Sequence, residues 1–248
     1  MKALAYFLII PAAMILDFVL ATNFGFYQRY PILPLLLIVT GLFFLIRLLF
    51  RKFTVLRLFL ALAGLTLSGF YGWWVVSYST YPALENTVAI GAQSDVMSLE
   101  LNDSAGETRT LSEIQGDSAA IMLIFYRGYW CPYCISELAH IQTGKALFDE
   151  ANVALAAVTV DEGEALKLAK TKASADFPIL SDNEGKLIDV FGLRHKGGNA
   201  IDGSDISRPA IIVLNREGKL IYSEYTDNYR VRPSPKKLAA NITERLKQ

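Results

Sequence analysis

The chain has 248 residues, of which 52% are hydrophobic and 19% are charged, and its mean hydropathy is +0.31. Basic and acidic residues balance overall, but residues 1–80 hold six basic residues and one acidic residue, a net charge of +5, and the remainder carries −5. The acidic second part argues against nucleic-acid binding, and the apolar first part argues against an entirely soluble protein.

Three apolar stretches, near residues 3–22, 32–49 and 58–78, predict transmembrane helices. Each is close to the roughly 20 residues that a helix needs to cross a bilayer. A cleaved signal peptide would explain only the first stretch, and a buried helical hairpin would show a polar face that the second stretch lacks. We therefore expect residues 1–80 to form a transmembrane helical anchor in the lipid membrane. Asp17 lies near the end of the first stretch, from which we expect it to reach the interface.

The distribution of basic residues predicts the orientation of this anchor. Only Arg29 lies in the first connection, whereas the second contains four cations, namely Arg47, Arg51, Lys52 and Arg57. The positive-inside rule places the second connection in the cytoplasm. We thus expect a cytoplasmic N-terminus and a second domain on the extracytoplasmic (periplasmic) side. Aromatic residues typical of a membrane interface cluster near the exit of the third stretch, at Tyr71, Trp73, Trp74, Tyr78 and Tyr81.

After an expected linker at residues 81–95, residues 96–248 alternate between strand and helix patterns. Predicted strands cover residues 97–103, 119–126, 153–161, 210–215 and 220–225. Predicted helices cover residues 111–114, 132–150, 162–174 and 234–247, the last with Ser234 as N-cap and Pro235 in the first turn. A βαβ unit followed by ββα predicts an α/β fold with a central mixed sheet.

Both cysteines of the chain lie in the segment FYRGYWCPYCISEL, where Cys131 follows a predicted buried strand and begins a predicted helix. Helix N-termini favour negative charge, so we expect a thiolate to form readily on Cys131. Pro132 suits the first helical position. Cys134, one turn further, is expected to be more buried and less acidic. An exposed attacking thiol beside a resolving thiol is the arrangement that thiol–disulfide exchange requires.

Other roles for a cysteine pair fit this sequence less well. A zinc site needs two further ligands, and neither His140 nor His195 has a ligand-like spacing. A structural disulfide closing so short a loop would stabilise the fold weakly. A redox role is therefore expected, without a metal. No sequence motif for a nicotinamide or flavin cofactor is present, so the electrons are expected from a thiol donor protein.

Four segments together resemble one known family: FYRGYWCPYCISEL, VTVDEGE, FPILSDNEGKLIDVFGL and RPAIIVLNREGKLIY. They are similar to the redoxin or alkyl hydroperoxide reductase/thiol-specific antioxidant (peroxiredoxin-like) family of the thioredoxin superfamily, which also includes membrane-tethered thioredoxin-like reductases. The resemblance covers about residues 88–246 and implies a thioredoxin-like fold.

The resemblance also implies roles for individual residues. Cys131 is similar to the nucleophilic first cysteine of thioredoxin-like dithiols, and Cys134 to the resolving one. Pro209 occupies the place of the family's cis-proline, which lies beside the disulfide. Glu137 resembles a glutamate of tethered reductases that tunes the second cysteine, with a solvated helix residue as the alternative. Trp130 resembles the aromatic residue that flanks thioredoxin active sites.

A second alignment places a peroxidase motif on the same residues. Peroxiredoxins carry Pro-x-x-x-Thr/Ser-x-x-Cys, in which the last cysteine attacks peroxide. Cys134 then takes the peroxidatic position, Cys131 replaces the threonine and Arg127 replaces the proline. The family's arginine aligns with Pro209. Arg208, one place earlier, points to the opposite face of a strand, and Arg127 could supply the positive field instead.

These departures favour a membrane-anchored thiol–disulfide oxidoreductase that uses Cys131-Pro-Tyr-Cys134 on a protein disulfide. The alternatives are a thiol peroxidase that reduces hydroperoxides with Cys134, and a membrane-held redox sensor or scaffold. The loop at Gly197-Gly198 with Arg194 and His195, and the segment 229–235, are candidate borders of the site.

Overall fold

The computed structural model describes residues 1–84, 88–89, 92 and 95–247, and the chain divides into two compact units, Met1–Tyr81 and Pro82–Gln248. The expected linker at residues 81–95 lies in part outside the described residues.

The first unit consists of three long helices, α1 (Lys2–Phe24), α2 (Ile32–Arg51) and α3 (Val55–Trp73), and a π-helical turn, η1 (Trp74–Tyr78), that continues α3. Spans of 23, 20 and 24 residues are long and apolar enough to cross a membrane. Large apolar side chains on their outer faces are exposed, among them Leu8, Ile15, Leu36, Phe43, Phe59 and Leu62. This surface fits lipid, because water would leave so many apolar groups unfavourably hydrated.

Small residues and one polar pair hold the three helices together. A Cβ atom on Gly41 would lie 2.9 Å from the backbone oxygen of Tyr6, so glycine permits close approach of α2 to α1. Asp17 is only 4% exposed, and its Oδ2 accepts a hydrogen bond of 2.8 Å from the hydroxyl of Tyr71 on α3. The expectation that Asp17 reaches the interface is therefore wrong: a donor from another helix satisfies the acid inside the bundle.

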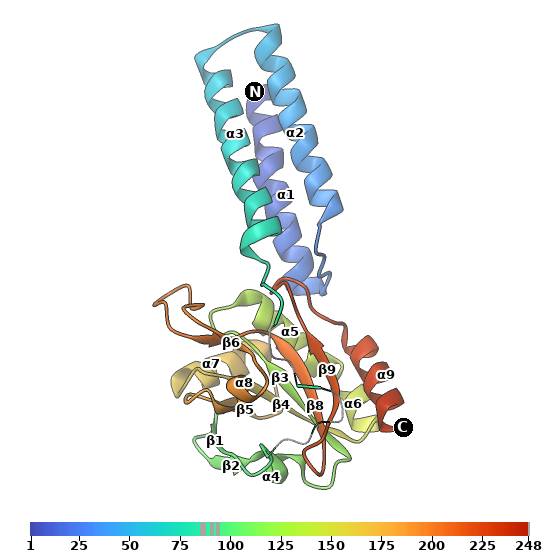
Figure 1. Cartoon of the computed structure of the whole chain (residues 1–248). Helices are drawn as coiled ribbons and strands as arrows, with labels where there is room; N and C mark the ends of the chain where they lie inside the picture. Colours follow the sequence, from blue (N-terminus) through green and yellow to red (C-terminus); the bar gives the residue numbers. More distant parts are fainter. Residues whose placement is uncertain (85–87, 90–91, 93–94, 248) are drawn as a thin grey trace. The chain divides into compact units, whose positions relative to one another are not determined.

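The second unit is built on a seven-stranded mixed sheet in the order β2-β1-β5-β4-β3-β8-β9, which can be followed in Figure 1. Its strands are β1 (Glu100–Asp103), β2 (Thr108–Thr110), β3 (Ala120–Phe125), β4 (Val153–Thr159), β5 (Ile179–Ser181), β8 (Ala210–Asn215) and β9 (Leu220–Tyr225). The strands β3, β4 and β5 are parallel, and β8 pairs antiparallel to both β3 and β9. The predicted α/β fold with a mixed sheet is confirmed.

Helices on both faces bury the centre of this sheet. They are α4 (Leu111–Gln115), α5 (Pro132–Thr143), α6 (Lys145–Glu150), α7 (Glu164–Ala173), α8 (Lys186–Val190) and α9 (Pro235–Leu246). Every residue of β3 is buried, as expected for a continuous apolar run with helices on both sides. Ile121, Leu123 and Phe125 of β3 pack in one cluster with Leu187 and other residues around α8. This rigid strand leads directly to the cysteines.

Several elements differ from the sequence prediction. The helix expected over residues 132–150 is divided at Gly144, where an added Cβ would lie 2.6 Å from the Cβ of Pro235. Any residue with a Cβ atom would therefore clash with the start of α9 at this position. The short strand β5 and helix α8 were not predicted, because three to five residues are too few to show a period. A two-stranded ribbon, β6 (Arg194–His195) with β7 (Ile206–Ser207), was also missed.

Candidate functional site

The dithiol lies at the N-terminus of α5, directly after the buried strand β3. Cys131 is the N-cap residue and Pro132 occupies the first turn, as predicted. The backbone N–H groups of Cys134 and Ile135 both donate to the Cys131 carbonyl oxygen, each at 3.1 Å. Both cysteines are free thiols, and Cys134 lies in the first turn of the helix. The positive end of the helix dipole favours negative charge on its sulfur.

The loop between β3 and α5 is held by a carboxylate from the neighbouring strand. The backbone N–H of Tyr129 donates to Oδ2 of Asp161, just after β4, at 2.8 Å. A Cβ on Gly128 would lie 2.6 Å from Nε1 of Trp130 and 3.1 Å from Asp161, so this loop needs glycine there. Burial raises the pKa of Asp161 to about 6, and the nearby Cys134 sulfur adds to the rise, although the hydrogen bond from Tyr129 opposes it.

Arg127 is buried within the same loop and is stacked between two aromatic rings. Its guanidinium carbon lies 4.8 Å from the ring centre of Trp130 and 4.3 Å from that of Tyr229. Its Nη2 donates to the carbonyl oxygen of Gly198 at 3.3 Å. These contacts hold a positive charge near the dithiol. Trp130 and Gly198 therefore both contact Arg127.

A second arginine contacts the dithiol directly. Arg232 lies in the segment between β9 and α9, and its Nη2 is 3.6 Å from Sγ of Cys134. Its Nε is 2.7 Å from Oε2 of Glu137, and these two side chains are 1% and 5% exposed. The segment 229–235 therefore does border the site. Arg232 itself was not predicted, because nothing in a sequence shows which of many arginines folds back onto a distant helix.

The surroundings of the two sulfurs are unequal. Burial raises the pKa of Cys134, but other interactions outweigh it and lower this pKa to about 6. They are a hydrogen bond from the Cys131 thiol, the charge of Arg232, and the backbone N–H and the charge of Arg127. Burial raises the pKa of Cys131, which is 1% exposed and donates its proton toward Cys134. Cys131 is therefore not the exposed thiol that the sequence predicts, and the two pKa shifts have the opposite directions to those expected. Of the two sulfurs, Arg232 contacts that of Cys134.

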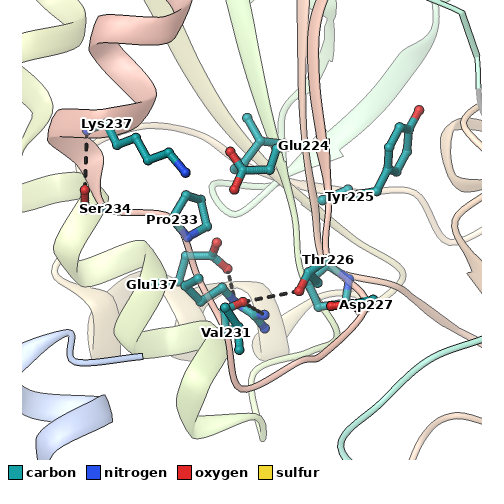
Figure 2. A pocket seen from close by; sticks show the side chains of 13 residues that line it. Glu137, Glu224, Tyr225, Thr226, Asp227, Val231, Pro233, Ser234 and Lys237 are labelled. Atoms are coloured by element: carbon teal, nitrogen blue, oxygen red, sulfur yellow. Dashed lines mark hydrogen bonds and ion pairs between the residues drawn. The ribbon is translucent and has the colours of Figure 1, made fainter. Parts of the chain in front are cut away.

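Glu137 is a buried partner of Arg232 rather than a solvated helix residue. Burial raises its pKa to about 7, and the Cys134 sulfur adds to the rise, although the charge of Arg232 opposes it. Its carboxyl group lines a pocket of about 300 Å³ that is bordered by Pro209, Glu224, Asp227 and Lys237. Figure 2 shows Glu137 beside Val231 and Pro233 in this pocket, with the side chain of Lys237 extending toward the same space.

Two further candidates, Arg208 and Pro209, lie just before β8 and do not take their expected roles. The Nη1 of Arg208 donates to the carbonyl oxygen of Pro82 at 2.8 Å, so this side chain is engaged at the start of the unit. The charges that lower the pKa of Cys134 come from Arg232 and Arg127 instead. Pro209 lines the pocket next to Glu137, but its peptide bond is trans, unlike the cis-proline that the resemblance implies.

A mixed sheet covered by helices, with a dithiol at the start of the helix after the central strand, defines a thiol-dependent oxidoreductase of thioredoxin-like fold. Residues 92–223 match the model of the AhpC/TSA family. This is more than half of the chain, and the protein belongs to that family. The resemblance inferred from the sequence is thereby confirmed.

Individual relatives fall into two kinds of enzyme. The chain is 30% identical to peroxiredoxin Bcp of Bacillus subtilis over 138 residues, which are 54% of this chain and 83% of the relative. It is 26% identical to the thiol-disulfide oxidoreductase ResA of Halalkalibacterium halodurans over 145 residues, 58% of this chain and 73% of the relative. Peroxidoxin BcpB of Mycobacterium tuberculosis shares the fold, with a TM-score of 0.52, 21% identity and coverage of 64% of this chain and 97% of that structure.

Proposed function

We propose that this protein is a membrane-anchored thiol peroxidase in which Cys134 attacks a hydroperoxide and Cys131 resolves the product. The carrying observation is the contact of 3.6 Å between Arg232 Nη2 and Cys134 Sγ. A buried thiolate needs a fixed counter-charge, and Arg232 supplies one at the second cysteine. The Cys131 thiol donates to that sulfur from the position that the threonine hydroxyl occupies in the peroxiredoxin motif.

The chemistry follows in three balanced steps. The Cys134 thiolate attacks one oxygen of the hydroperoxide and breaks the O–O bond, so that sulfur becomes a sulfenic acid and the alkoxide takes a proton to leave as an alcohol. The Cys131 thiol then attacks the sulfenic sulfur, which releases water and forms the Cys131–Cys134 disulfide. Two thiols of an electron donor protein reduce this disulfide by exchange and become a disulfide themselves.

Burial favours a small substrate. Cys131 is 1% exposed and Cys134 is fully buried, so a sulfur of a folded partner protein would have to displace surrounding side chains to reach either of them. A hydroperoxide is small enough to enter where a protein disulfide is not. The structure thereby supports the peroxidase over the exchange reaction that the sequence favours.

Disulfide exchange is the second candidate, and a specific observation favours it as well. Glu137 lies one helical turn after Cys134, where the resemblance to tethered reductases places a tuning glutamate, and it contacts the same arginine as Cys134. The ResA relatives are thiol-disulfide oxidoreductases by name. In this reaction, one sulfur of the pair forms a mixed disulfide with the substrate and the other releases it.

The two functions are distinguished by comparing the rates at which a hydroperoxide and a protein disulfide oxidise the reduced full-length protein. We expect stopped-flow tryptophan fluorescence in detergent micelles to show faster oxidation by hydrogen peroxide or cumene hydroperoxide than by an oxidised protein disulfide at equal concentration. Both reactions end in the same disulfide, which mass spectrometry verifies. Faster reaction with the protein disulfide would support the second candidate, and turnover with neither oxidant would leave a redox sensor or scaffold.

We also propose that helices α1 to α3 anchor the domain with its dithiol on the extracytoplasmic side. The support is the excess of basic residues between α2 and α3, together with the positive-inside rule. Alkaline phosphatase fused after Gln248 is expected to be active in a bacterial host, and the same reporter fused after Lys52 to be inactive. The reverse pair of activities would contradict the orientation.

A further inference from the structure

The segment that carries Arg232 is a compact turn with its own hydrogen bonds. The hydroxyl of Thr226 donates to the carbonyl oxygen of Asn228 at 2.7 Å, and the backbone N–H of Val231 donates to the same carbonyl at 3.0 Å. Nη1 of Arg232 donates to the carbonyl oxygen of Val231 at 3.0 Å. The Ser234 hydroxyl then caps α9. Arg232 is therefore held in place before any substrate arrives.

Arg232 contacts two acidic groups of α5 with different nitrogens of one planar group. Nη2 faces the sulfur of Cys134, and Nε faces the carboxyl group of Glu137 at 2.7 Å. Cys134 and Glu137 are three residues apart, so they share one face of the helix. The fork geometry of guanidinium allows both contacts at once, which a lysine ammonium, a single point charge, does not.

The position of Arg232 in the chain adds a second argument. The family match ends at residue 223, before the segment that carries Arg232. Within the matched part, Pro209 stands where the resemblance places the arginine that stabilises the attacking thiolate, and the neighbouring Arg208 bonds to Pro82. The site therefore has Pro209 where the resemblance places an arginine, and it holds Arg232, which lies outside the matched residues.

We propose that Arg232 is the catalytic arginine of this site and that Glu137 competes with Cys134 for its charge. This proposal rests on the proposed function, in which Cys134 is the attacking thiolate. While Glu137 is ionised, it neutralises part of the positive charge that stabilises the thiolate. When Glu137 is protonated, Arg232 acts on Cys134 alone. The carboxyl group exchanges protons through the 300 Å³ pocket that it lines, and Cys134 does not line that pocket.

The competition predicts shifts of opposite sign for two substitutions. Glu137→Gln removes the competing charge and lowers the pKa of Cys134. Adding Arg232→Gln to that variant removes the counter-charge as well and raises this pKa by about 1–3 units, the usual effect of an opposite charge at such a distance. The double variant leaves no unpaired buried charge at these two positions, so it is expected to fold. A general loosening of the site would not produce shifts of opposite sign.

The measurement is the pH profile of iodoacetamide alkylation of Cys134 in the full-length protein in detergent, with Cys131→Ser so that one thiol remains. At pH 7, Arg232→Gln in the Glu137→Gln background is expected to slow alkylation by about twofold if the pKa of Cys134 rises by 1 unit and by about tenfold if it rises by 2 units, because the thiolate fraction falls. Arg232→Lys alone is expected to give a pKa between those of the parent and the double variant. Arg208→Gln serves as the matched control and leaves the profile unchanged.

The outcomes separate this inference from the proposed function. An equal Cys134 pKa in Glu137→Gln and in the double variant would overturn the role of Arg232, and a higher pKa in Glu137→Gln than in the parent would overturn the competition. If the expected shifts occur but Cys134→Ser still consumes hydroperoxide, Arg232 remains the counter-ion of Cys134 and the peroxidase proposal fails. If Cys134→Ser loses activity while the shifts are absent, the peroxidase proposal stands and the role of Arg232 as counter-ion of Cys134 fails.

Discussion

Cys134→Ser is expected to reduce hydroperoxide consumption by at least about 10³-fold, because a serine hydroxyl does not ionise near neutral pH and no thiolate remains. Cys131 is not expected to replace it, since burial raises the pKa of the Cys131 thiol. The measurement is peroxide loss by the full-length protein in detergent with a dithiol reductant, over pH 6–8.

Substitutions of Cys131 provide the matched controls. Cys131→Ser or Cys131→Thr restores a hydroxyl donor at the position where the peroxiredoxin motif has one, so each is expected to consume one equivalent of peroxide at close to the parent rate. Each then stops at a Cys134 sulfenic acid, which dimedone traps for mass spectrometry. Cys131→Ala removes the donor to the thiolate, which costs about 1.5–3 kcal/mol and slows this first step by about 10–100-fold.

The opposite pattern would establish the exchange mechanism. If Cys131→Ser abolishes reaction with both oxidants, and Cys134→Ser accumulates mixed disulfides with a protein substrate, Cys131 is the attacking sulfur. The thiolate at Cys134 would then act as the resolving group. Because both variants change one sulfur to oxygen, differences in packing do not account for a difference between them.

Arg232→Met is expected to destabilise the domain by about 3–5 kcal/mol at pH 8, the usual cost of removing one partner from a buried ion pair. The Glu137 carboxylate and the Cys134 thiolate would both lose their shared counter-ion in a site where the side chains are at most 5% exposed. Urea denaturation of the full-length protein in detergent, followed by near-UV circular dichroism, measures the effect. The loss is expected to be smaller at pH 5, where both groups can take up a proton.

The double variant Arg232→Met/Glu137→Leu is the control for packing. It replaces the buried ion pair with apolar groups and is expected to recover most of the loss, since such replacements are often close to neutral. A double variant as unstable as Arg232→Met alone would show that Arg232 stabilises the fold through its packing rather than through its charge.

The same two groups give the parent protein a defined pH dependence. The folded-state pKa of Glu137, about 7, lies above its ordinary value of 4.5, so stability falls as the pH rises from about 4.5 to 7. The folded-state pKa of Cys134, about 6, lies below its ordinary value of 9.0, so this group adds stability as the pH rises from about 6 to 9. Glu137→Gln should remove the first trend and Cys134→Ser the second.

Local patterns were enough to predict much of this protein. The apolar stretches near residues 3–22, 32–49 and 58–78 coincide with long helices, because length and apolarity are local properties. The run at residues 119–126 predicts the buried strand β3, and Pro132 after it predicts the start of α5. Gly144 was the only local sign of the break between α5 and α6, and its contact with Pro235 of α9 became visible only in the folded structure.

The sequence by itself determined that two thiols lie in the first turn of a helix that follows a buried strand. It also determined that this strand and helix belong to a redoxin-like domain preceded by an apolar N-terminal region. Only the tertiary structure decided which arginine contacts one of these sulfurs. Arg232 lies 98 residues from Cys134 along the chain, yet its guanidinium contacts that sulfur at 3.6 Å. Asp17 likewise finds its donor 54 residues away, on Tyr71. Electrostatic energies depend on distance in space and on burial, and only the folded chain brings these groups together.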